Sequence, residues 1–146
     1  MHCPWLKTLG GVVLVVALLS GAASSSAAQS DWRAEFTRDV TGFKRVAQGN
    51  ADLWKTEPLF ESQFNAFEIY AGELKAEGRQ LEALRPPRRC SEVQEDTVKL
   101  LWRAAWTSKA LGEAKNYTSW EFEHGGEKLR KLPFRLGDAR REAENC

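Results

Sequence analysis

The chain has 146 residues, and its 21 Lys and Arg nearly balance its 20 Asp and Glu, for a net charge of +1. This length suits a single domain with one core. Because the charges balance, composition gives no reason to expect a protein that binds nucleic acid or lies on an anionic membrane.

The N-terminal segment has the organisation of a secretory signal peptide. Lys7 gives the head a positive charge, Leu9–Leu19 is almost wholly apolar, and residues 20–28 are mostly Ser and Ala. This order of basic, apolar and small residues is typical of export signals. The alternative is an uncleaved membrane anchor, but the apolar run is about half of the ~20 residues that a spanning helix needs.

The cleavage site follows from the small residues. Ser26-Ala27-Ala28 fits the small-x-small rule, so we predict cleavage after Ala28, with cleavage after Ala23 as the second choice. Residues 1–28 are then the signal peptide and residues 29–146 a single domain. We expect this mature domain to be periplasmic or extracellular, of bacterial origin, and without a stable membrane anchor.

Four stretches of the mature chain carry apolar residues at helical spacing. They cover about residues 31–48, 58–84, 91–117 and 118–146. Their predicted inner faces are, in chain order, Trp32, Phe36, Val40, Phe43 and Ala47; Phe60, Phe64, Phe67, Ala71, Leu74, Gly78 and Leu81; Val93, Thr97, Leu100, Leu101, Ala104, Ser108 and Leu111; and Phe122, Gly126, Leu129, Pro133, Leu136 and Ala143.

The helix boundaries follow from local signals. Ser30 is a suitable N-cap and Gly49-Asn50 a stop signal for the first helix. Pro86-Pro87 ends the second helix, and Ser91 with Gln94 forms a capping-box pattern for the third.

These segments predict an all-α fold, an antiparallel up-down helical bundle of three long helices plus a shorter N-terminal helix. Similar lengths and short loops favour this arrangement. Gly125, Gly126 and Pro133 interrupt the last segment, where we expect a kinked helix or two shorter ones.

Two cysteines, Cys90 and Cys146, remain after cleavage. In an exported protein they favour a disulfide, and bundle geometry returns Cys146 to the end where the third helix starts. The alternatives are two free thiols, with Cys90 activated by a helix N-terminus and neighbouring arginines, or pairing between chains.

Motifs for catalysis or metal binding are missing. His124 is the sole mature histidine, and Glu121, Glu123 and Glu127 around it favour a solvated helix face over a metal site, which usually has three or four ligands. The sequence has no nucleophile elbow, zinc-protease motif or phosphate-binding loop. We therefore expect no catalytic residues, no metal and no cofactor.

Trp102 and Trp106 lie four residues apart, so they share one helix face, away from the predicted inner stripe. We expect this pair to be buried under the first helix, where Trp32 and Phe36 would meet it. The alternative is a surface for a ligand or a protein partner.

The segment Leu84-Arg-Pro-Pro-Arg-Arg-Cys-Ser-Glu-Val-Gln94 resembles a hinge in uncharacterised small exported bacterial proteins, where a Pro-Pro turn joins two long helices. Pro86, Pro87 and Val93 match that pattern. Gln94 stands where those proteins often have histidine, so no role of that histidine is carried over. The resemblance spans about residues 58–117 and implies an all-α exported domain without supplying an activity.

Three functions remain. We favour a non-enzymatic exported bundle that acts through protein–protein contact with an unknown partner. The second is a carrier of an apolar small molecule or lipid in an aromatic-lined cavity. An enzyme comes third.

Overall fold

The chain is built from helices alone in the part that the structure describes. The computed structural model describes residues 20–53, 61–114 and 119–146, and these ranges contain no strand. The predicted all-α class is confirmed. The helices are α1 (Ser20–Leu53), α2 (Glu61–Ala83), α3 (Ser91–Glu113) and α4 (Ser119–Asn145), with a 3-10 turn, η1 (Arg88–Cys90), directly before α3.

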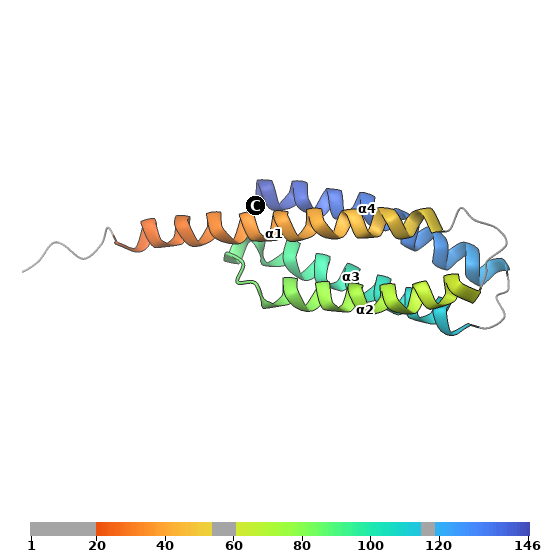
Figure 1. Cartoon of the computed structure of the whole chain (residues 1–146). Helices are drawn as coiled ribbons and strands as arrows, with labels where there is room; N and C mark the ends of the chain where they lie inside the picture. Colours follow the sequence, from red (N-terminus) through yellow and green to blue (C-terminus); the bar gives the residue numbers. More distant parts are fainter. Residues whose placement is uncertain (1–19, 54–60, 115–118) are drawn as a thin grey trace, which may run out of the picture.

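The four helices pack as two close pairs. Figure 1 shows α1 beside α4 and α2 beside α3, and these two pairs make the most extensive contacts. The pairs are joined because α3 also contacts α4, and α1 contacts α2 more lightly. Each helix therefore has two main neighbours around one core, and its outer side faces no other helix.

The core follows the predicted helical faces closely. All five predicted positions of α1 are buried, from Trp32 to Ala47. Phe64, Val93 and Leu100 are only half-buried, while the side chains of Phe60 and Phe122 lie outside the described residues. The other predicted inner positions are buried, and they are Phe67, Ala71, Leu74, Gly78, Leu81, Thr97, Leu101, Ala104, Ser108, Leu111, Gly126, Leu129, Pro133, Leu136 and Ala143.

The first helix differs from its prediction at both ends. It runs through Ser30 and through Gly49-Asn50, so neither is a boundary of this helix. The side-chain Nδ2 of Asn50 donates to the Val46 carbonyl oxygen, one turn earlier in the helix, at 2.9 Å. Its first turns project past the other three helices (Figure 1).

The predicted signal peptide falls only partly within the described residues, because residues 1–19 lie outside them. The predicted cleavage site after Ala28 lies inside α1, so cleavage leaves residues 29–53 of this helix in the bundle. Among the helices of the described part, none has an apolar stretch long enough to cross a membrane.

The last helix is continuous where interruptions were expected. Gly125, Gly126 and Pro133 all lie within α4, so the prediction of two shorter helices is wrong. Pro133 has no N–H to donate to the Leu129 carbonyl, yet both residues are buried, and packing offsets the lost bond. At Gly125 the helix lies so close to Leu111 that an added Cβ would come within 3.1 Å of that side chain.

Candidate functional site

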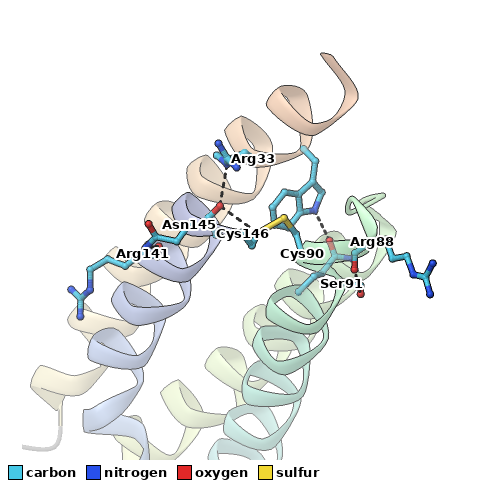
Figure 2. Close-up of a disulfide and its surroundings, with 10 residues drawn as sticks. Arg33, Arg88, Cys90, Ser91, Arg141, Asn145 and Cys146 are labelled. Carbon is cyan, nitrogen blue, oxygen red and sulfur yellow. Dashed lines mark hydrogen bonds between the residues drawn. A yellow bond between two sulfur atoms is a disulfide. The ribbon is translucent and has the colours of Figure 1, made fainter. Parts of the chain in front are cut away.

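The two cysteines meet at one end of the bundle. Cys90 ends η1 and Cys146 is the last residue of the chain, and their Cα atoms lie 5.2 Å apart in a disulfide, as predicted (Figure 2). Cys90 is fully buried. Arg33 reaches across from α1, and its Nε donates to the Ala143 carbonyl oxygen at 3.0 Å. The end of α4 is therefore held by a covalent bond to η1 and by a hydrogen bond to α1.

Gln94 performs a different task from the predicted capping box. Its Oε1 accepts a hydrogen bond from the Trp32 indole N–H at 2.7 Å, and its Nε2 donates to the Leu84 carbonyl oxygen at 3.1 Å. The capping box is wrong because η1 continues directly into α3, so Ser91 is already helical and donates to the Arg88 carbonyl oxygen at 2.8 Å. Gln94 instead ties α1, the end of α2 and α3 together.

The two tryptophans of α3 have different environments. Trp102 is half-buried against α2, where an added Cβ on Gly78 would lie 3.5 Å from its Nε1. Trp106 is 74 % exposed, so the expected burial of this side chain is wrong. The cause is the position of α1, which packs chiefly on α4 and leaves the outer side of α3 open. Trp32 stacks on Phe36 in its own helix, with ring centroids 4.9 Å apart.

Trp106 stands at the edge of a hollow between α3 and α4. The hollow has a volume of about 620 Å³. Leu100 is half-buried, and Ala104 and Leu132 are buried at its floor. Trp106 is the one Phe, Tyr or Trp side chain among its described lining residues. The hollow thus combines an apolar floor with a large exposed aromatic ring, which is a frequent composition of binding sites.

Positive charge dominates the walls of this hollow. The lining cations are Arg103 from α3 and Lys128, Lys131 and Arg135 from α4, against a single carboxylate, Glu127. Lys131 is paired with Glu127 one helical turn away. Arg103, Lys128 and Arg135 make no ion pair among the described residues. Their charge is available to an anionic group that enters the hollow.

His124 also lines the hollow, at the start of the same face of α4. Within the described residues, no three His, Cys, Asp or Glu side chains are grouped so that they could hold a metal ion. The side chains of Glu121 and Glu123 lie outside that part.

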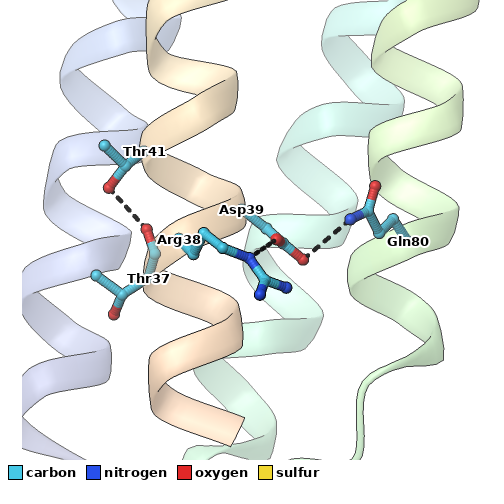
Figure 3. A network of polar contacts seen from close by, with 5 residues as sticks. All are labelled: Thr37, Arg38, Asp39, Thr41 and Gln80. Carbon is cyan, nitrogen blue, oxygen red and sulfur yellow. Dashed lines mark hydrogen bonds and ion pairs between the residues drawn. The ribbon is translucent and has the colours of Figure 1, made fainter.

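A second polar cluster lies where α1 faces α2. Asp39 is buried and accepts hydrogen bonds from the Arg38 Nε and the Gln80 Nε2, both at 3.2 Å (Figure 3). Glu77 Oε2 is buried without a hydrogen-bond partner. Burial, with the charges of Asp39 and Glu73 nearby, raises the pKa of Glu77 to about 7. The Tyr70 hydroxyl is also buried and unpartnered, and burial raises its pKa above the usual value.

Arg38 of this cluster lines another large hollow, of about 710 Å³. The residues that line this hollow all belong to α1, so no second element closes around a ligand there. The face between α3 and α4 is the best candidate site.

No protein-family model, curated protein or solved structure matches this chain significantly. The resemblance of the Pro-Pro segment to small exported helical proteins therefore stays a prediction.

The cations of the α3–α4 face were not among the residues that the sequence singled out. A signal was present, because His124, Lys128, Lys131 and Arg135 recur at steps of four, three and four along α4. Such a stripe beside an apolar face is common on solvated helices. Only its position opposite Arg103 and Trp106 distinguishes it.

Proposed function

We propose that the mature chain is an exported, non-enzymatic helical bundle that works by binding a protein partner through the α3–α4 face. We further propose an antiparallel up-down order of the helices. The meeting of Cys90 and Cys146, at the start of α3 and the end of α4, supports this order.

The observation that carries the binding proposal is the exposure of Trp106. Trp106 is 74 % exposed at the edge of the basic hollow, where its indole offers a partner a large apolar surface beside cations. Trp and Arg are also the residues most enriched among those that dominate binding energy at protein interfaces. Trp106 and Arg103 lie on the same side of α3 and line the same hollow.

Export is supported by the N-terminal pattern and by the disulfide. Disulfides persist in oxidising compartments and are rare in the cytosol. The first turns of α1 project beyond the bundle (Figure 1), so removing residues 1–28 leaves the buried positions from Trp32 onward in place.

A non-enzymatic role is proposed because the groups that converge on the hollow are mainly cations. Cations can bind and orient an anionic group. Acyl or phosphoryl transfer would also need a nucleophile with an adjacent base, or a metal.

Site-specific photocrosslinking tests this function. A photoreactive residue is placed at position 106, and a matched one at position 69, where Ile69 is 66 % exposed on α2. We expect one protein to be captured from position 106 and none from position 69. The purified captured protein should then bind the chain at least about tenfold more weakly when Trp106 is changed to Ala. Equal capture from both positions would contradict the proposal.

A carrier of an apolar small molecule is the second candidate. The hollow of about 620 Å³ falls in the usual range for small-molecule sites. Native mass spectrometry of the chain purified from its own host distinguishes the two. A stoichiometric small molecule favours the carrier, and a bare chain with an associated protein favours the interaction.

A further inference from the structure

The hollow beside Trp106 is one half of a longer groove. A second hollow, of about 450 Å³, lies along the same two helices towards the disulfide. The two share Leu100, Arg103 and Arg135, so they adjoin along the α3–α4 face. On α4 the groove runs from His124 to Glu142, which at 1.5 Å per residue is about 27 Å. On α3 it runs from Val93 to Thr107, or about 21 Å.

The two halves of the groove differ in charge, because the half beside Trp106 is mainly cationic and the charges of the other half balance. The half beside Trp106 has the cations Arg103, Lys128 and Arg135, which are not paired with any described carboxylate. The half towards the disulfide has three carboxylates, Asp96, Asp138 and Glu142, and three cations, which are Lys99 and the shared Arg103 and Arg135. The Asp96 Oδ1 lies 3.8 Å from the Lys99 Nζ, and the Asp138 carboxylate is paired with the Arg141 guanidinium.

We propose that this groove receives an amphipathic α-helix of the partner protein, with acidic residues at the end that lies beside Trp106. This inference rests on the proposed function and names the chemistry of the partner. A groove of about 21 to 27 Å takes a helix of roughly 14 to 18 residues. The apolar stripe of that helix packs on Leu100, Ala104 and Leu132 and against the Trp106 indole. Its carboxylates pair with Arg103, Lys128 and Arg135.

A helix fits this groove better than an extended peptide does. The walls are two α-helices, whose backbone groups are already hydrogen-bonded within each helix, so an extended peptide would find no partners for its own backbone. A helix satisfies its backbone internally and presents only side chains. A lipid chain fits less well, because charged side chains line both sides of the groove along its length.

Designed peptides of 18 residues test the proposal. The first is helical and amphipathic, with Leu on one face and Glu flanking it in one half. The second peptide has Lys in place of each Glu. The third has the same amino-acid composition as the first, but its sequence is reordered so that a helix would have no apolar face. Binding is measured by titration with 15N-labelled mature chain, following the Trp106 indole signal. We expect the first peptide to bind at least about tenfold more tightly than either of the others.

Two matched double variants locate the charges. Lys128→Glu with Arg135→Glu reverses two groove cations and should weaken binding of the acidic peptide at least about tenfold. Arg45→Glu with Arg130→Glu makes the same change in net charge at exposed positions outside the groove and should leave binding within about twofold. Circular dichroism checks that both variants fold. Trp106→Ala, at an exposed position, supplies a second test that does not change charge. Its binding is followed by backbone amide signals of α3 and α4, and it should weaken binding of the acidic peptide at least about tenfold.

Several outcomes would overturn the proposal. These are equal binding of all three peptides, a loss of binding in both double variants, or a Trp106 signal that moves with chain concentration or anionic vesicles but not with the acidic peptide. Concentration dependence would assign the groove to a second copy of the chain, and vesicles would assign it to lipid. If the captured protein binds through Trp106 while the peptides fail, the proposed function stands and the acidic helix is wrong.

Discussion

Removal of the disulfide is the perturbation whose effect the structure defines most sharply. The Cys90–Cys146 bond closes a loop with a sequence separation of 56 residues. In the chain-entropy model, a loop of this size restricts the unfolded chain by about 4 kcal/mol. Cys90→Ala with Cys146→Ala in the mature chain should therefore lower the free energy of unfolding by about that amount.

The same figure gives the expected change in melting temperature. A domain of about 118 residues has an unfolding entropy near 0.25 kcal/mol/K, so ~4 kcal/mol corresponds to a fall of about 16 °C. Thermal and urea unfolding followed by circular dichroism measure both quantities. Reductant should lower the melting temperature of the unaltered chain similarly and leave the double variant unchanged, which makes the variant the control for other effects of the reductant.

A fall of less than about 4 °C would refute this reasoning. It would mean that Arg33 and the buried Ala143 hold the end of α4 without the covalent bond. Two titratable thiols in the native mature chain would show that Cys90 and Cys146 do not form a disulfide.

Three further changes test the packing. Gln94→Ala should lower the free energy of unfolding, measured with denaturant, by about 2 kcal/mol or more. A double-mutant cycle with Trp32→Phe should show a coupling energy near 1 kcal/mol. Additive effects of the two changes would argue against the Trp32–Gln94 hydrogen bond. Since Glu77 has a folded pKa of about 7 against 4.5 unfolded, its contribution to stability is fully present below pH 4.5 and is lost as pH rises through 7. Glu77→Gln should therefore make the melting temperature depend less on pH between pH 5 and about 8. An unchanged pH dependence would count against the raised pKa of Glu77. Gly112→Ala should destabilise the fold by about 1–3 kcal/mol, because the added Cβ would come within 3.0 Å of the Glu68 backbone nitrogen. Gly72→Ala is the control, because Gly72 faces open space and the change should not destabilise the fold in this way. Equal effects of the two changes on thermal unfolding would contradict this prediction.

Much of the fold is predictable because the helical period directly reports burial. Trp32, Phe36 and Val40 recur at helical spacing, and each is buried in the core. The pairing of Cys90 with Cys146 is predictable for a related reason. Helix lengths and loop positions limit which chain ends can meet, and these two lie at the same end of the bundle.

Local patterns mislead where tertiary contacts compete with them. Ser91 and Gln94 have the spacing of a capping box, yet the buried Trp32 indole and the Leu84 carbonyl compete for the Gln94 amide. The buried Trp32 indole N–H would otherwise lack a hydrogen bond, which costs more than an open helix end beside solvent. The local sequence around Gln94 cannot predict this contact, because Trp32 lies 62 residues away.

The site was misjudged for a different reason. Periodicity identifies the inner face of a helix but not how many neighbours surround it. Trp106 is exposed because α3 has α2 and α4 as its main neighbours, while α1 packs on α4. Arg103, Lys128 and Arg135 likewise form one cationic surface only because α3 lies beside α4, and residue spacing alone does not predict this pairing.

The most direct test of the central claim is hydrogen exchange of the chain with and without its captured partner. Binding through the α3–α4 face predicts slower exchange in residues 100–107 and 124–135 and no change around Ile69 on α2. Protection centred on the outer side of α1 or α2, with these two segments unchanged, would contradict the account.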